Sequence, residues 1–191
     1  MLRTLCVFCG SSSGSDPIYR NTAEAVGKLL ARRGIGLVYG GGKVGLMGTV
    51  ADACLAAGGR VTGVMPQLLV DKEVAHAGLT ELRVVDSMHE RKALMADLSD
   101  AFLALPGGFG TWEEFFEVLT WSQLGIHRKP CALLNINAFY DPLLAMAENA
   151  VASGFLRAAN RELLLADTDL ERLLERLSDA EVPLVDKWIN C

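Results

Sequence analysis

The chain has 191 residues, of which 51% are hydrophobic and 21% are charged, and its formal net charge at pH 7 is −5. This length suits one domain, here residues 1–191, and hides about 70% of the unfolded surface on folding. The acidic balance argues against a general nucleic-acid or acidic-membrane surface, which would need a basic face, and no apolar stretch is long enough to span a bilayer.

Short apolar runs alternate with longer amphipathic segments along the whole chain. The runs are continuously rather than alternately apolar, which is typical of parallel strands covered by helices on both faces. We expect strands at residues 4–9, 36–39, 60–65, 81–85, 101–105, 131–135 and, weakly, 163–165. This pattern predicts an α/β fold with one doubly wound, Rossmann-like parallel sheet of about seven strands.

The segments between these runs have the end signals of helices. Asp16 is expected to cap a helix that has Pro17 at its first position. Residues 87–90 and 168–171 both have capping-box spacing. We expect helices at residues 17–33, 44–57, 87–98, 111–122, 140–153 and 168–179. Residues 180–191 then form a C-terminal tail that packs on the body or on a partner.

The five cysteines are an odd number and fit reduced thiols better than a disulfide framework. Cys6 and Cys9 form a C-x-x-C inside an expected strand, where an offset of three places the side chains on opposite faces. No further Cys/His pair follows at zinc-finger spacing, so we expect buried apolar thiols, no metal and no cofactor. The apolar run at residues 5–8 is too short for a signal-peptide core, and we expect a cytoplasmic protein.

Doubly wound sheets bind ligands beyond the carboxyl ends of their strands. Four unusual loops follow expected strands, at residues 10–14, 40–45, 87–92 and 106–111. Their convergence at one edge predicts a binding site for a phosphorylated small molecule. Ser11 and Ser12 have no His or Asp at a recognisable triad spacing, so we interpret them as phosphate or ribose hydrogen-bonding groups rather than nucleophiles.

The loop at residues 40–45 satisfies G-x-G-x-x-G between a strand and a helix. Backbone N–H groups at Gly41 and Gly42 are expected to contact a phosphate, with a merely tight turn as the alternative. The dinucleotide interpretation lacks an acidic residue at the end of the next strand. The P-loop interpretation fails because Leu37 replaces the first Gly and Val44 replaces Ser or Thr.

The second Gly-rich loop, at residues 106–111, opens a helix directly. Thr111 and Glu114 have capping-box spacing, so Glu114 is either a structural cap or a ligand contact, and Glu113 is either favourable at a helix start or a ligand contact. The spacing alone leaves both alternatives open. The residues of this loop expected to bind substrate are Gly107, Gly108, Gly110 and Thr111.

Arg91 lies three residues after Met88 and four before Met95, on the apolar stripe of an expected helix. Burying an uncompensated charge costs several kcal/mol, so an inward Arg implies an anionic partner. That partner is a structural carboxylate, a phosphate or an active-site carboxylate. Lys92 is a candidate helper, although a solvated Lys is the alternative. His76 lies in an expected loop and, like His127, is interpreted as an ordinary surface or interface group.

The helix after Gly110 is apolar on more than one face, with its apolar residues at 115, 116, 118, 119 and 121. A helix of this kind needs cover beyond its own sheet. We expect a homodimer contact here, with a deeper core of the single domain as the alternative.

Taken together, the sequence resembles one family over about the whole chain. The resemblance rests on V-F-C-G-S-S at residues 7–12, Y-G-G-G at 39–42 with G-L-M-G at 45–48, M-H-E-R-K at 88–92, P-G-G-F-G-T-W-E-E at 106–114, and residues 120–130. These segments are similar to the LOG family of cytokinin riboside 5′-monophosphate phosphoribohydrolases, also called LONELY GUY proteins and long described as lysine decarboxylases.

The resemblance implies hydrolysis of the N-glycosidic bond of N6-modified adenosine 5′-monophosphates, which releases the free base and ribose 5-phosphate. AMP is implied as a poorer or alternative substrate. The family motifs imply that Arg91 and Glu114 are catalytic and that Glu73 binds substrate near the base or the ribose. Two departures, Phe109 where Tyr is common and Trp112 where Leu is common, leave the preferred N6 substituent open.

The chemistry suits these residue types. Cleaving the ribose–purine bond develops oxocarbenium character on the sugar and negative charge on the base. A carboxylate stabilises the cation or directs water, whereas an Arg, with a pKa above about 12, holds phosphate or offsets charge rather than donating a proton. The alternatives are a pyridoxal-phosphate decarboxylase, for which no Lys is marked as a Schiff-base former, and a nucleotide or cofactor carrier without turnover.

Overall fold

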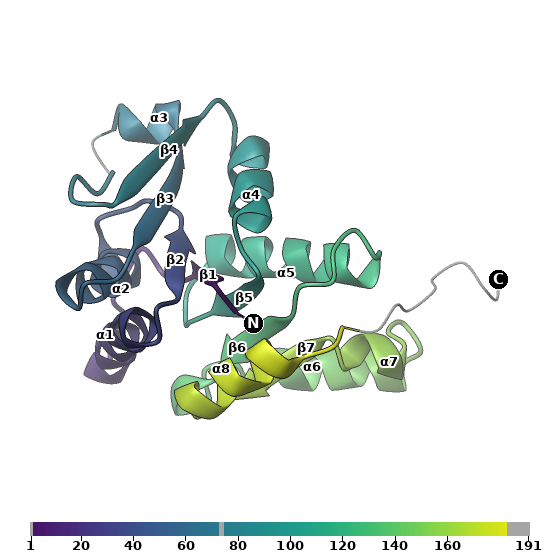
Figure 1. The fold of residues 1–191 in the computed structure, drawn as a ribbon. Helices are drawn as coiled ribbons and strands as arrows, with labels where there is room; N and C mark the ends of the chain where they lie inside the picture. The colour runs from purple at the N-terminus through teal and green to yellow at the C-terminus, as the bar shows by residue number, and fades with distance from the viewer. Residues whose placement is uncertain (1, 73–74, 183–191) are drawn as a thin grey trace.

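The computed structural model describes residues 2–72 and 75–182, which form one sheet covered by helices on both faces (Figure 1). Its seven strands are all parallel and lie in the order β4-β3-β2-β1-β5-β6-β7. The strands are β1 Thr4–Phe8, β2 Gly36–Tyr39, β3 Val61–Pro66, β4 Glu81–Val85, β5 Ala101–Ala104, β6 Cys131–Leu134 and β7 Leu164–Asp167. The predicted fold class is confirmed, and the winding direction reverses between β1 and β5, the place where such sheets bind ligands.

Six longer helices form the two outer layers. Buried residues of α1 Pro17–Arg32, α2 Gly45–Ala56 and α8 Leu170–Asp179 share one core cluster with Leu5 and Val7 of β1. Side chains of α4 Met88–Asp97, α5 Phe109–Gln123 and α6 Asp141–Ala152 pack with Cys6 and Phe8 on the other face. The sequence did not predict the short elements α3 Gln67–Val70, η1 Ile136–Ala138 and α7 Ala158–Arg161.

The cysteines of the C-x-x-C behave as expected. Cys6 belongs to the core under α4 and α5, whereas Cys9 belongs to the core under α1 and α2. Both thiols are free and buried, and burial raises the pKa of each well above its ordinary value. These two residues are therefore packing groups on opposite faces.

Two of the predicted helix starts are observed. The Asp16 side chain accepts a hydrogen bond of 2.9 Å from the N–H of Ile18, next to Pro17 at the first helical position. Ser87 Oγ accepts from the N–H of Glu90 at 3.1 Å. The returning bond of this box goes from the N–H of Asp86 to Glu90 Oε2, one residue before the expected donor.

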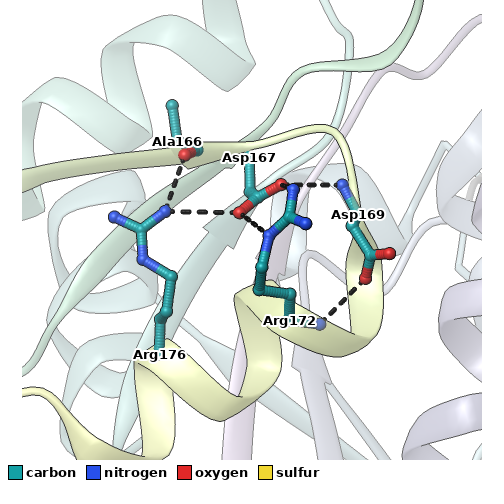
Figure 2. Close-up of polar contacts among 5 residues, drawn as sticks. All are labelled: Ala166, Asp167, Asp169, Arg172 and Arg176. Atoms are coloured by element: carbon teal, nitrogen blue, oxygen red, sulfur yellow. Dashed lines mark hydrogen bonds and ion pairs between the residues drawn. The ribbon is translucent and has the colours of Figure 1, made fainter.

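The capping box predicted at residues 168–171 is wrong. Asp169 caps α8 instead and accepts from the N–H of Arg172 at 2.9 Å (Figure 2). The neighbouring Asp167 carboxylate accepts from Arg172 Nε at 2.7 Å and lies 3.4 Å from Arg176 Nη1. The hydrogen bond from Arg172 holds the pKa of Asp167 well below its usual range. This cluster fastens α8 to the end of β7.

Helix α8 ends at Asp179, and the expected tail begins directly after it. Residues 183–191 of that tail lie outside the described residues, so its packing stays a prediction. Within residues 2–72 and 75–182, no helix combines the length and apolar character needed to cross a membrane.

Candidate active site

Three of the predicted loops meet where the sheet reverses direction. The N–H of Gly10, after β1, donates to the carbonyl of Pro106, after β5, at 3.1 Å. The Gly10 carbonyl in turn accepts from the N–H of Leu46 at 3.0 Å, at the start of α2. A cavity of about 250 Å³ lies between these loops, and its walls include Ser11, Gly108, Gly110, Thr111, Arg91 and Glu114.

A buried ion pair forms the floor of this cavity. Arg91 Nη1 lies 3.2 Å from Glu114 Oε1, and the two side chains are only 10% and 12% exposed. Arg91 Nε also donates to the carbonyl of Val64 at 3.1 Å, and Nη2 donates to the carbonyl of Gly40 at 3.3 Å. The inward cation predicted from the sequence is therefore present, and its partner is a carboxylate in the cavity wall.

Gly40 makes room for the guanidinium. A Cβ at this position would lie 1.9 Å from Arg91 Nη2 and 3.1 Å from Cζ. Only Gly allows Arg91 to reach this carbonyl, so the first Gly of the G-x-G-x-x-G pattern has a packing reason.

The capping box predicted for Thr111 and Glu114 is wrong. Gly108 is the N-cap of α5, no side chain caps this helix end, and Thr111 is the third helical residue. The cause is that Gly108 takes the extended N-cap conformation three residues before Thr111, the N-cap of the predicted box. Glu114 is thereby free of a capping role and pairs with Arg91.

The first turn of α5 opens onto the cavity. The N–H groups of its first three residues have no partner within the helix, and the helix dipole makes this end favourable for anions. A Cβ added at Gly108 or Gly110 would meet no atom within 4 Å, so the space beside them is open. At Gly107 a Cβ would lie 2.1 Å from Thr111 Oγ1, which explains the Gly there.

Glu114 is the titratable group that the site perturbs. Burial raises the pKa of its carboxyl above the ordinary value, and the charge of Arg91 offsets part of this rise. Such a group in a cavity is a candidate for proton transfer.

The glycine loop of residues 40–45 packs closely against other parts of the chain. The N–H groups of Leu46 and Met47 both donate to the Gly10 carbonyl, and a Cβ at Gly45 would lie 2.3 Å from the carbonyl carbon of Ser11. Gly41 and Gly42 pair with residues 75–76 instead of lining the cavity. The phosphate contact expected at Gly41 and Gly42 stays a prediction.

Lys92 and Glu113 pair with each other beside the cavity. Lys92 Nζ forms an ion pair with Glu113 and lies 3.0 Å from Glu117 Oε2. Ser12 lies in the wall of a neighbouring cavity together with Gly107. Glu73 lies outside the described residues. The substrate contacts expected of these residues stay predictions.

Similarity to known proteins identifies the family. A family model described as "Possible lysine decarboxylase" matches residues 47–177. The chain is 54% identical over 170 residues to the cytokinin riboside 5′-monophosphate phosphoribohydrolase of Rhodococcoides fascians, covering 88% of this chain and 86% of that protein. The chain belongs to the LOG family. It is also 52% identical to a probable cytokinin riboside 5′-monophosphate phosphoribohydrolase of Oryza sativa subsp. japonica, over 93% of this chain and 78% of that protein. Its identity to a cytokinin riboside 5′-monophosphate phosphoribohydrolase of Arabidopsis thaliana is 46%, over 94% of this chain and 82% of that protein.

Solved structures of distant proteins share the fold of this LOG family member. The molybdenum cofactor binding protein of Rippkaea orientalis has a TM-score of 0.69 at 21% identity and covers 93% of this chain and 96% of its own. The molybdenum cofactor carrier protein of Chlamydomonas reinhardtii has a TM-score of 0.70 at 19% identity, covering 94% of this chain and 100% of its own. At these identities the likeness shows the fold alone.

Neither Lys43 nor Lys92, the candidate Schiff-base lysines, supports the description as a lysine decarboxylase. A Schiff-base Lys needs a lowered pKa, usually from burial or a neighbouring cation. Burial tends to lower the pKa of Lys92, but its hydrogen bonds with Glu113 and Glu117 outweigh that effect and raise it. Lys43 is exposed. The environment of Lys92 therefore favours a protonated amine.

Sequence reasoning missed several residues of the LOG family cavity. Cys9, Met47 and Phe109 line it without having been predicted as site residues, although all three belong to the motifs that carry the resemblance. Phe109 is 85% exposed and stands edge-on to Trp112, with ring centroids 5.4 Å apart. His76 is not a free surface group, because its side chain is only 12% exposed and its Nε2 lies 2.8 Å from Asp52 Oδ1; the interface alternative stays a prediction.

Proposed function

We propose that this chain hydrolyses the N-glycosidic bond of N6-modified adenosine 5′-monophosphates, with AMP as a poorer or alternative substrate. The buried ion pair of Arg91 and Glu114, beside the uncapped start of α5, is the observation that carries the proposal. The phosphoribohydrolases to which the chain is about half identical carry the names of enzymes with this activity.

The substrate's phosphate is proposed to bind at the first turn of α5. Its anionic oxygens suit the unpaired N–H groups and the dipole of this 15-residue helix. The Ser11 hydroxyl, across the same cavity, supplies a further donor to phosphate or ribose. This arrangement leaves the ribose beside Arg91 and Glu114.

Hydrolysis then requires one bond to form and one to break. Glu114 accepts a proton from water as the water oxygen bonds to ribose C1′, and the C1′–nitrogen electron pair leaves with the purine. The Glu114 carboxylate also stabilises the oxocarbenium character of the sugar, and the proton passes to the leaving base. Arg91 stays charged throughout and stabilises the negative charge that develops on the leaving base.

The test is an end-point assay of the purified protein with N6-isopentenyladenosine 5′-monophosphate and with AMP. Chromatography should detect free base and ribose 5-phosphate in equal amounts, and the ratio of the two rates ranks the substituents. A folded protein that binds these nucleotides and leaves them intact would contradict the proposal and favour a carrier.

A homodimer is proposed at the outer face of α5. An apolar groove of about 360 Å³ runs between α5, α6 and α7, lined by Phe116, Leu119, Met146 and Phe155 among others. Phe155 is 91% exposed and Met146 is 58% exposed. A second copy of the chain docked here would remove this apolar surface from water. Asn160 Oδ1 in the groove wall is buried and has no hydrogen-bond partner among the described residues.

Light scattering after size-exclusion chromatography tests the dimer. The wild-type protein should elute as a dimer, and Phe155→Asp should shift it toward the monomer. Leu68→Asp is the matched control because Leu68 is also exposed, at 66%, but lies on α3 away from the groove. A monomeric wild type, or a Phe155→Asp variant that stays dimeric, would contradict this interface.

A cytoplasmic location is also proposed. Cys6, Cys9, Cys54 and Cys131 are free thiols, as expected in a reducing compartment. Cell fractionation with an antibody to the protein tests it, and recovery outside the cytoplasmic fraction would contradict it.

A further inference from the structure

A short segment after α3 lies against the glycine loop of the site. Gly42 pairs with Ala75 in an antiparallel bridge, and the N–H of His76 donates to the carbonyl of Gly41 at 2.9 Å. Residues 40–42 are three consecutive glycines with no side chains to pack, and Gly41 has a φ of +78°. A stretch of this kind loses more conformational freedom on ordering than any other sequence, so bonds from outside are needed to hold it.

The His76 side chain fastens this segment to helix α2. Its Nδ1 accepts from the N–H of Gly78 at 3.0 Å, which closes the turn. Since Nδ1 accepts, the ring proton is on Nε2, which lies 2.8 Å from Asp52 Oδ1 on α2 and donates to it. The two ring nitrogens therefore tie the segment to itself and to a rigid helix.

We call the contacts of His76 with Asp52 and with the glycine loop the latch. A continuous set of hydrogen bonds leads from this latch to the ion pair of Arg91 and Glu114. The latch holds Gly41 and Gly42, and the adjoining Gly40 carbonyl accepts from Arg91 Nη2. Arg91 Nη1 faces Glu114. The position of the Gly40 carbonyl therefore helps to set the direction of the guanidinium.

We propose that His76, together with Asp52, is a positioning residue that fixes the glycine loop and thereby orients Arg91 against Glu114. The inference rests on the function proposed above. Neither His76 nor Asp52 lines the cavity, so neither is expected to touch the substrate.

The test compares the steady-state kinetics of wild type, His76→Ala, Asp52→Ala and the double variant, with base release as the readout. Each single variant should lower kcat/KM by about 10- to 100-fold, because a misplacement near 1 Å costs this much. The loss should fall on kcat with KM near the wild-type value, since Arg91 acts in the transition state. The double variant should lose no more than either single variant, because both remove one latch.

Two further variants separate positioning from general effects. His76→Gln keeps an N–H donor toward Asp52 and should recover part of the lost kcat. Asp52 lines a surface groove between α1 and α2, and Glu24 lines the same groove. Glu24→Gln removes this other charge and should leave kcat and KM at the wild-type values. Asp52 is 71% exposed, so its Ala variant folds even if His76→Ala does not.

The outcomes are distinguishable. An inactive wild type overturns the proposed function and, with it, this inference. An active wild type with Asp52→Ala at wild-type kcat, or with effects that multiply in the double variant, overturns the latch and leaves the proposed function standing.

Discussion

Gly40→Ala is the substitution that separates catalysis from folding most cleanly. The new Cβ would lie 1.9 Å from Arg91 Nη2, whereas real Cβ atoms keep at least 3.0 Å from other heavy atoms. The guanidinium must shift by about 1 Å, a misplacement that can lower the rate about 100-fold. At ~1.36 kcal/mol per tenfold, this is a loss of about 2.7 kcal/mol of transition-state stabilisation.

The fold should survive this change, because the new methyl group meets the end of a side chain rather than backbone. The assay is kcat/KM for base release, with circular dichroism to check that the variant is folded. Gly36→Ala is the matched control at the start of β2, the strand that leads to Gly40, since its Cβ would meet nothing closer than 3.7 Å. A Gly40→Ala variant with wild-type kcat/KM, or a Gly36→Ala variant with an equal loss, would refute the role given to the Arg91 position.

Three other predictions follow from the same geometry. The kcat/KM of the enzyme should fall as the pH drops through the raised pKa of Glu114, with the acid limb above the ordinary value of 4.5, because protonation removes the base; a limb at or below 4.5 would contradict this. Asp167→Asn should lower the thermal-unfolding midpoint by about 2–4 °C at neutral pH. Since the folded pKa of Asp167 is depressed, that difference should shrink as the pH falls below the unfolded value of about 4, and a constant difference would contradict the ion-pair account. Gly110→Ala should raise KM without lowering stability, because its Cβ meets only open space at the anion-binding turn, and an unchanged KM would argue against phosphate there.

The sheet could be predicted from the sequence because each buried strand is a continuous apolar run. The observed strand ends differ from the expected ones by at most two residues. The end signals were less reliable, because several residues compete for one cap. At α8 the N-cap is Asp169 rather than Thr168. At α5 the N-cap is Gly108 rather than Thr111, and it caps the helix without a side-chain hydrogen bond.

The sequence predicted several residues of the site, but not which of them contact one another. The position of Arg91 on an apolar stripe indicated an inward cation, whereas its partner Glu114 is 23 positions away on another helix. That distance closes only when α4 and α5, the helices that follow β4 and β5, pack on the same face of the sheet. The contact between His76 and Asp52 joins residues 24 positions apart and has no motif to mark it.

The role of Glu114 as the general base is tested most directly by comparing Glu114→Gln with wild type on the same nucleotide substrate. Nucleotide affinity is measured by calorimetry and base release by chromatography. Glu114→Gln keeps a hydrogen-bond acceptor for Arg91 but loses the general base. Its nucleotide affinity should therefore stay within a few-fold of wild type, while its turnover should fall by at least about 100-fold. Arg91→Ala should likewise abolish turnover in a folded protein. Base release by Glu114→Gln at the wild-type rate would contradict the account.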